Sequence, residues 1–132
     1  MISLLWQDSV LSLLDQSVYP QEERWLTCTS LEETVQVLSS GAILEEKIAA
    51  IAGAYGLCQA ALAAQDLQQT PQFDEVLAGA RAMLLESRNH SRDMQLALDF
   101  MADPPEAYTR NVDRITTLLA TAVTFERHQV VA

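Results

Sequence analysis

The chain has 132 residues, of which 49% are hydrophobic, and this length is enough for one substantial core but too short for two. Its 18 acidic residues outnumber its 8 basic residues, which gives a formal net charge of -10 at pH 7. The phosphate backbone of a nucleic acid and the surface of an anionic membrane would both repel such a molecule. The arginines are scattered along the sequence and form no basic stripe. We therefore exclude nucleic-acid-binding and membrane-surface proteins as function classes.

The sequence shows no targeting or membrane-spanning pattern. The amino-terminal stretch MISLLWQDSVLSLL has an acidic residue at position 8 and no positively charged segment, so no secretory signal is predicted and we expect a cytoplasmic protein. The longest apolar run, residues 48–64, is rich in alanine and is interrupted by Gln59. This composition predicts a buried helix rather than a membrane span.

Short apolar blocks separated by polar stretches run from residue 3 to about residue 28. The blocks LLW, VLSLL and WLTC are typical of short strands joined by turns. We expect a hairpin or a three-stranded antiparallel sheet in this part of the chain. Asp15 and Gln16, which follow the second block, have no evident charged partner and are interpreted as turn or sheet residues.

The period of the apolar residues changes to a helical one after the third block. Ser30 followed three residues later by Glu33 is a capping-box arrangement, which predicts a helix that ends near residues 39–41. A second helix, rich in alanine, is expected over residues 44–65.

Three further helices are predicted from cap residues and from apolar residues at intervals of three and four. Their ranges are 71 to about 86 after Thr70, 92–102 after Ser91, and from Pro105 or Glu106 to about 128. The chain is therefore expected to be a single α+β domain over residues 1–132 that is mostly α. A small N-terminal antiparallel β-sheet (residues 1–29) precedes a bundle of about five helices (residues 30–128).

The two cysteines, Cys28 and Cys58, lie far apart and lack the spacing of a metal site. We expect buried free thiols in a reducing compartment, with a disulfide as the alternative. The sequence also contains no P-loop, no Ser/His/Asp order and no metal-ligand spacing, so no cofactor is predicted.

Four ordered blocks resemble the amino-terminal domain of methylthioribose-1-phosphate isomerase. LLWQDSVLSLLDQSVYP is similar to the family pattern L-x-W-x-D-G-x-L-x-L-L-D-Q-x-x-L-P, and LEETVQVLSSGAI follows it. AAIAGAYG is similar to the end of R-G-A-P-A-I-G-x-A-A-A-Y-G, and SRNHSRDMQLALDFM is similar to A-R-P-T-A-V-N-L-x-W-A-L-D-R-M. The resemblance covers roughly residues 4–125. It extends to the regulatory subunits of translation initiation factor 2B, which share this architecture.

The resemblance implies that the family's catalytic cysteine and aspartate lie in a larger Rossmann-like α/β domain. This chain ends before such a domain would begin, so we expect it to be no enzyme by itself. Neither Cys28 nor Cys58 lies at the position of the catalytic cysteine.

The resemblance also implies two phosphate contacts within this domain, from the R-G-A motif and from the arginine of A-R-P-T. Aligned without gaps, R-G-A falls on Leu44, Glu45 and Glu46, and an alternative alignment on residues 40–42 also lacks the arginine. Carboxylates there would repel a phosphate by on the order of 1 kcal/mol per charge. We interpret Leu44, Glu45 and Glu46 as a degenerate phosphate motif and Arg88, at the second position, as a candidate sugar-phosphate-binding residue.

Each candidate also has a structural interpretation. Arg88 either binds an anion beside the helix that begins near Ser91, or is a surface arginine paired with a carboxylate. His90 is either an acid or base near neutral pH or a solvated turn residue. Glu45 and Glu46 point about 100° apart on a helix, so they are not expected to share an acid–base site.

The function that these observations favour is a non-catalytic oligomerisation or protein-interaction module. Its partner is expected to be a second copy, joined through the C-terminal helix or the small-residue helix, or a separately encoded protein. Two alternatives stay open. One is a sensor for a phosphorylated sugar, held by Arg88 with residues 39–46 as a lid, and the other is half of a split aldose-ketose isomerase.

Overall fold

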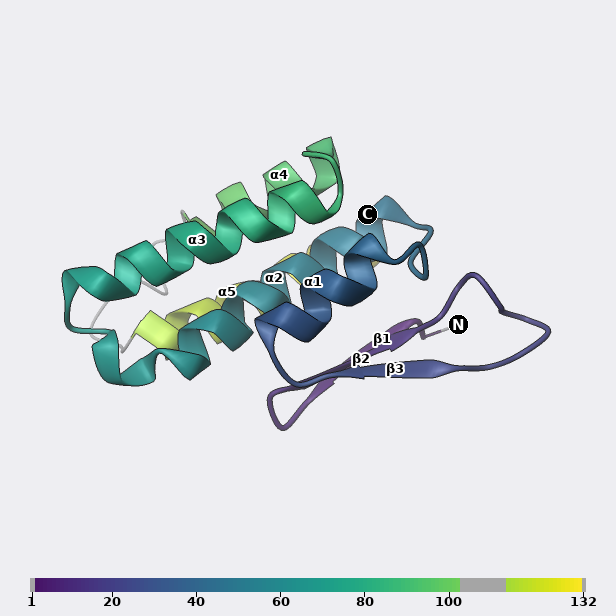
Figure 1. Ribbon diagram of the computed structural model, residues 1–132, viewed down its shortest axis with the longest axis horizontal. Helices are drawn as coiled ribbons and strands as arrows, with labels where there is room; N and C mark the ends of the chain where they lie inside the picture. Colours follow the sequence, from purple (N-terminus) through teal and green to yellow (C-terminus); the bar gives the residue numbers. More distant parts are fainter. Residues whose placement is uncertain (1, 103–113, 132) are drawn as a thin grey trace.

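The computed structural model describes residues 2–102 and 114–131 and consists of a small sheet beside a group of long helices (Figure 1). Strands β1 (Leu4–Gln7), β2 (Val10–Leu14) and β3 (Trp25–Cys28) pair antiparallel in the order β1-β2-β3. Leu11 of β2 lies opposite Trp6 on one side and Cys28 on the other. The three-stranded sheet expected within residues 3–28 is confirmed.

A two-residue turn joins β1 to β2. Asp8 and Ser9 have φ values of 53° and 65°, so both lie in the left-handed region. Turns of this kind match the twist of the two strands and favour asparagine, aspartate or glycine. Ser9 takes a conformation here that glycine would adopt with less strain.

The capping box predicted for the first helix is present in a modified form. Helix α1 spans Leu31–Ser39, and the Ser30 hydroxyl oxygen accepts the Glu33 backbone N–H at 3.2 Å. The Glu33 carboxylate accepts the backbone N–H of Thr29 at 2.9 Å and also the Thr29 hydroxyl. These hydrogen bonds from Thr29 lower the pKa of Glu33, and together the two side chains fix the start of the helix.

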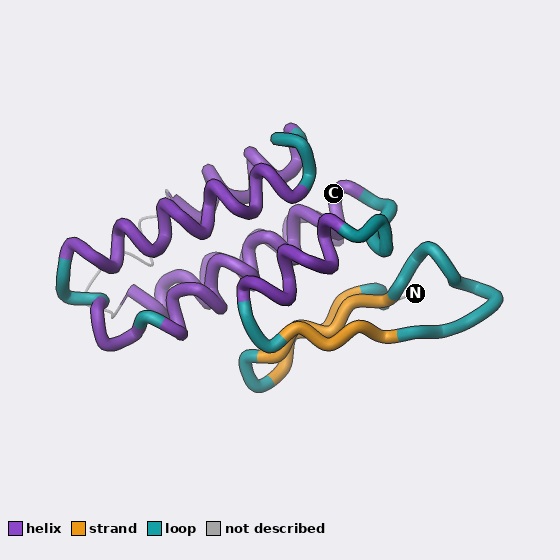
Figure 2. Tube along the Cα trace, in the orientation of Figure 1, coloured by secondary structure: helices purple, strands orange, loops and turns teal. Residues whose placement is uncertain are grey.

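Helix α2 is the centre of the domain (Figures 1 and 2). It packs against the four other long helices and against β1 and β2. Residues 49–61 are all buried. The middle of this small-residue helix therefore has no side open to a partner within the described structure, and the expected dimer stays a prediction. The element bounds are α2 (Glu46–Ala63), α3 (Pro71–Ser87), α4 (Arg92–Ala102) and α5 (Arg114–Val131).

The α+β, mostly helical class is thus confirmed, with differences at the ends of elements. α2 begins at Glu46 rather than at residue 44 because the backbone of Glu45 is extended. It ends at Ala63 rather than at residue 65, and a short 3₁₀ helix, η1 (Gln65–Leu67), follows. The predicted start of the last helix at 105 or 106 lies outside the described residues. No helix in the described ranges is long and apolar enough to cross a membrane.

Glycine allows helix α4 to approach α2 closely. A Cβ atom added at Gly53 would overlap Sδ of Met94, which is itself fully buried on α4. A Cβ at Gly56 would lie 3.2 Å from Thr34 Cγ2, on α1. Small residues at these positions therefore set how near the surrounding helices come to α2.

A buried polar chain joins the sheet to two helices. The Thr34 hydroxyl donates to Gln59 Oε1 at 2.5 Å, and Gln59 Nε2 donates to the Cys28 carbonyl oxygen at 2.9 Å. Gln59, which interrupts the apolar run of α2, therefore has partners on both α1 and β3. Satisfied hydrogen bonds of this kind offset the cost of burying an amide.

Two glycine-to-alanine substitutions test the close packing around α2. Gly53→Ala is expected to lower the free energy of unfolding by about 1 to 2 kcal/mol, because overpacking against Met94 outweighs the gain in helix propensity. Gly79→Ala in α3, where an added Cβ meets nothing within 4 Å, is the matched control and is expected to raise it by about 0.5 to 1 kcal/mol. Urea denaturation measures both. Equal effects of the two substitutions would contradict this account of the packing.

Candidate functional site

The two regions expected to contribute a phosphate site meet at one end of the helices. Arg88 follows the last residue of α3, and its Nη2 donates to Glu46 Oε1 at 2.5 Å at the first turn of α2. Its Nη1 donates to the Leu38 carbonyl oxygen at 2.8 Å near the end of α1. The Arg88 side chain is only 10% exposed. One guanidinium thus joins the ends of three helices.

The charge of Arg88 is already matched by a carboxylate of the same chain. An arginine that is buried to this degree needs an anionic or carbonyl partner, and Glu46 and Leu38 supply both kinds. The second carboxylate oxygen of Glu46, Oε2, is buried without a hydrogen-bond partner. Of the two interpretations of Arg88, the structure supports pairing with a carboxylate, although the arginine is largely buried rather than on the surface.

Gln16 occupies the backbone donors just before α2. Its Oε1 accepts the backbone N–H groups of Leu44 at 2.6 Å and Glu45 at 3.0 Å. Its Nε2 donates to Glu45 Oε1 at 3.2 Å, and its backbone N–H donates to the Ala42 carbonyl at 2.8 Å. The interpretation of Gln16 as a turn or sheet residue missed this contact. Two backbone donors just before the helix are therefore bound to a neutral side chain.

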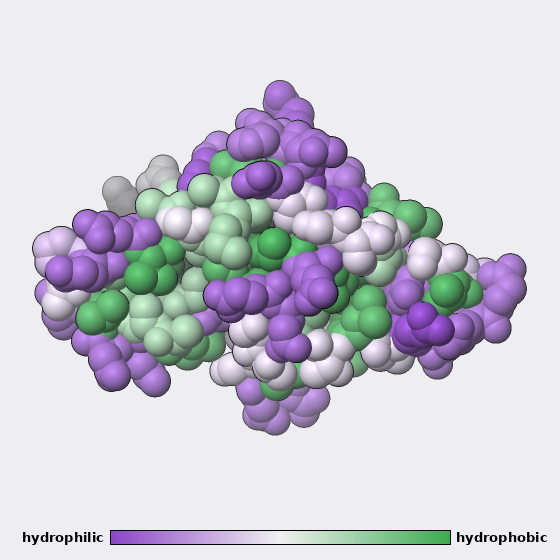
Figure 3. Space-filling view, viewed as in Figure 1, coloured by the Kyte–Doolittle hydropathy of each residue, from purple (hydrophilic) through white to green (hydrophobic). Residues whose placement is uncertain are grey.

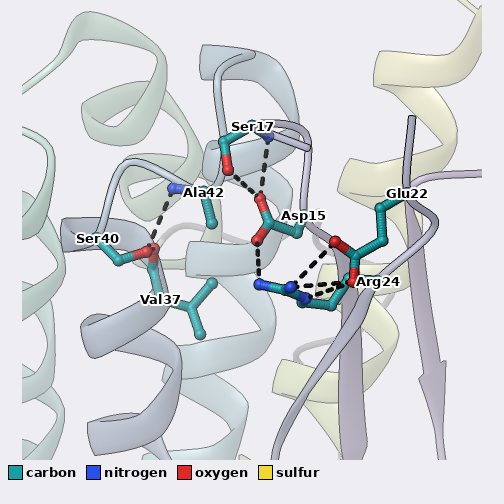
Figure 4. A network of polar contacts seen from close by, with 7 residues as sticks. All are labelled: Asp15, Ser17, Glu22, Arg24, Val37, Ser40 and Ala42. Carbon is teal, nitrogen blue, oxygen red and sulfur yellow. Dashed lines mark hydrogen bonds and ion pairs between the residues drawn. The ribbon is translucent and has the colours of Figure 1, made fainter. Parts of the chain in front are cut away.

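Asp15 anchors the loop that follows β2 (Figure 4). Its carboxylate is 6% exposed and accepts the backbone N–H of Ser17 at 3.0 Å and the Ser17 hydroxyl at 2.5 Å. Arg24 Nη1 lies 4.0 Å from Asp15 Oδ2, and Nη2 of the same guanidinium donates to Glu22 Oε1 at 2.9 Å. Asp15 therefore has a charged neighbour that the sequence did not reveal, and its contacts hold the loop in place.

The remaining predicted site residues do not join Arg88 in a reactive group. Leu44 is 63% exposed, and Glu45 is exposed and bound to Gln16. His90 is exposed in a turn where its φ is 54°, with its backbone N–H donating to the Leu85 carbonyl at 2.7 Å. The described residues contain no group of histidine, cysteine, aspartate or glutamate that could hold a metal ion.

Both thiols are buried and unbonded to each other. Cys28 and Cys58 are free and 0% exposed, which confirms the expectation of buried free cysteines. Burial raises the pKa of Cys28, against a smaller lowering by the Thr34 hydroxyl, and burial raises the pKa of Cys58 to about 12. Neither sulfur is therefore a thiolate near neutral pH.

A separate cavity of about 470 Å³ lies between α2, α3, α4 and α5. Its rim carries two ion pairs, Arg81–Asp99 at 2.6 Å and Arg114–Asp74 at 2.5 Å, and the Arg114 pair lowers the pKa of Asp74. Each arginine there has its own carboxylate, so the rim offers an anion no excess positive charge. None of the candidate residues lines this cavity.

The fold and the Arg88 region define a class: a three-stranded sheet beside helices packed around one buried helix. No family model matches the chain. Methylthioribose-1-phosphate isomerase of Pseudomonas entomophila (strain L48) is 30% identical over 118 residues, which are 89% of this chain and 32% of that protein. The isomerase of Alkalilimnicola ehrlichii is 29% identical over 130 residues, 98% of this chain and 37% of that protein. This chain thus spans about a third of the length of these relatives.

Solved structures share the fold at lower sequence identity. The 5-methylthioribose 1-phosphate isomerase of Pyrococcus horikoshii OT3 matches with a TM-score of 0.78 and 13% identity, over 96% of this chain and 36% of that one. The delta subunit of translation initiation factor eIF-2B from A. fulgidus matches with a TM-score of 0.70 and 20% identity, over the same shares of the two chains. The chain therefore matches an amino-terminal domain of the methylthioribose-1-phosphate isomerase family, as the sequence blocks indicated.

Thiol accessibility tests the burial of both cysteines. In native buffer we expect no reaction with Ellman's reagent within minutes, because neither Cys28 nor Cys58 is exposed. In denaturant both thiols are expected to react. A Ser39→Cys variant, altered at an exposed position, serves as the control and should react at once in native buffer. Rapid labelling of the unaltered native chain would show that the core opens far more readily than its packing implies.

Proposed function

We propose that this domain acts as an oligomerisation or protein-interaction module and catalyses no isomerisation by itself. The observation that carries the proposal is the ion pair between Arg88 and Glu46, which places a carboxylate on the arginine that would hold a sugar phosphate. Gln16 supports it further, because this side chain binds the two backbone donors before α2. A dianion arriving at this end would have to displace both arrangements.

The state of the two thiols points the same way. The two thiols of the chain are buried and have raised pKa values, so they are unsuited to attack a substrate or to move a proton at neutral pH. The isomerase relatives are about three times as long as this chain, and their whole-protein activity is therefore not assigned to it.

Exposed apolar surface at the same end of the domain favours an association role. Leu44 is 63% exposed immediately before α2, and Tyr19, in the loop after β2, is 42% exposed. Exposed large apolar side chains of this kind are typical anchors of protein contacts. We infer that the segment with Leu44, rather than the buried α2, forms the contact surface.

Sedimentation velocity at micromolar concentration tests the association. We expect a dimer or larger species for the unaltered chain and at least a tenfold weaker association (about 1.4 kcal/mol) for Leu44→Asp, which places a charge in the contact. Leu96→Asp is the matched control, because Leu96 is 50% exposed on α4, and it should leave the association unchanged. A chain that stays monomeric at all these concentrations would remove self-association and leave only a separate protein partner.

Calorimetry tests whether the Glu46 carboxylate prevents an anion from binding to Arg88. The unaltered chain is expected to give no heat with inorganic phosphate or methylthioribose-1-phosphate at millimolar ligand. Glu46→Ala is expected to bind phosphate in the millimolar range, because Arg88 then lacks its carboxylate partner. The double variant Glu46→Ala, Arg88→Ala should lose this binding. Heat from the unaltered chain that disappears in Arg88→Ala would instead support the sugar-phosphate sensor.

A further inference from the structure

A groove of about 690 Å³ opens between the start of α1, the end of α2 and the middle of α3. It contains neither Arg88 nor Leu44, so it is distinct from the region discussed above. Figure 3 shows apolar surface between α3 and α1, bordered by hydrophilic side chains. The apolar lining comes from Leu31 at the start of α1 and from residues at the end of α2 and in the middle of α3, among them Ala63, Val76, Gly79 and Met83.

The part of the groove on α3 is a continuous helical stripe. Val76, Gly79, Ala80 and Met83 recur at intervals of three and four residues, so they follow one face for about 10 Å of helix. Met83 is 39% exposed although it is a large apolar residue. Two turns of apolar surface of this length suit another helix that lies along the groove.

Gly79 has no packing role within the described part of the chain. A Cβ added there would meet nothing within 4 Å, whereas glycine inside a helix costs about 1 kcal/mol relative to alanine. Ala63 and Ala80, which also line the groove, are small as well. Small residues of this kind let a second backbone approach closely.

The charges around the groove select the partner. The only charged residues that line it in the described structure are Glu32 of α1 and Glu75 of α3, and both are exposed. No lysine or arginine lines it, and the chain as a whole carries a formal charge of -10. A second copy would bring the same acidic surface against these carboxylates. A segment with lysines or arginines beside its apolar residues would match both the apolar lining and the acidic border.

We propose that this groove docks a basic amphipathic helix of a partner protein. Apolar side chains of that helix enter the space over Gly79 and Ala63, and its basic residues face Glu32 and Glu75. The inference rests on the proposed interaction function and adds to it a surface and a partner chemistry. It is independent of self-association through Leu44, because that residue does not line the groove.

The first test is fluorescence anisotropy with a labelled 14-residue peptide of leucine and lysine, designed with leucines on one helical face. A scrambled peptide of the same composition is the control for non-specific attraction. Gly79→Trp fills the groove and is expected to weaken binding of the amphipathic peptide at least tenfold (about 1.4 kcal/mol). Ala82→Trp adds the same side chain at an exposed position of α3 outside the groove, and it should leave the affinity within about twofold.

If circular dichroism shows that Gly79→Trp is misfolded, a second variant keeps the test decisive. Met83→Gln removes an apolar contact without changing the charge or the length of the side chain, and it is expected to lower the affinity for the peptide about threefold to tenfold. Equal affinity of the unaltered chain and of the folded groove variants would overturn the proposal. So would equal affinity for the amphipathic and scrambled peptides.

A charge pair separates the groove from the general acidity of the chain. The double variant Glu32→Gln, Glu75→Gln is expected to lower the affinity for the peptide about fivefold. The double variant Glu23→Gln, Glu86→Gln removes the same charge elsewhere on the surface and should change the affinity by less than about twofold. Equal losses of affinity would mean that the peptide is attracted only to an acidic surface and would overturn the assignment.

The oligomeric state of the variants separates a second copy from a partner protein. If Gly79→Trp converted an oligomer into a monomer in the absence of peptide, the occupant of the groove would be a second copy and the partner assignment would fall. Loss of self-association in Leu44→Asp with unchanged peptide binding would leave the groove proposal standing.

Discussion

The architecture depends on burying α2 on every side. A helix surrounded in this way packs against neighbours on all of its faces. The neighbouring helices approach it closely only where its side chains are small. Residues 49–61 meet this condition with alanines and two glycines. Because α2 is enclosed, its first turn is held in a fixed position relative to the ends of α1 and α3. The contacts of Arg88 with Glu46 and Leu38 follow from that placement.

Arg88 and Glu46 form one ion pair that joins the end of α3 to the start of α2. Arg88 is mostly buried, and a buried guanidinium without an anionic partner would be strongly unfavourable. The resemblance places Arg88 at a phosphate-contact position and Glu46 in the motif that has lost its positive charge. A carboxylate at Glu46 supplies permanently the negative charge that a bound phosphate would supply only when present. Glu46 thus neutralises Arg88 without any ligand.

Local signals in the sequence predicted local structure well. Ser30 and Glu33 placed the start of α1, Thr70 and Pro71 placed that of α3, and alternating apolar blocks placed the strands. What these signals could not predict are contacts between distant parts of the chain.

Gln16 and Leu44 are far apart in sequence, and so are Arg88 and Glu46. Only the arrangement of the sheet and the ends of three helices brings them together. The family pattern marked Glu46 and Arg88 as positions of interest but did not indicate that they pair, and Gln16 was interpreted only as a turn or sheet residue. The groove was invisible to sequence reasoning because its residues come from separate elements and are individually ordinary.

The buried amide of Gln59 has a consequence for how uniquely the chain folds. Its partners are one hydroxyl and one particular carbonyl, that of Cys28. If β3 slid by one residue along β2, that carbonyl would turn to the opposite side of the strand, and the amide would be left buried without an acceptor. The same slip would carry the buried side chain of Cys28 to the other face of the sheet, so apolar burial and the hydrogen bond of the amide favour the same register. Gln59, a polar residue within an otherwise apolar stretch of helix, therefore adds a directional hydrogen bond to the apolar pattern that selects the native register of the sheet.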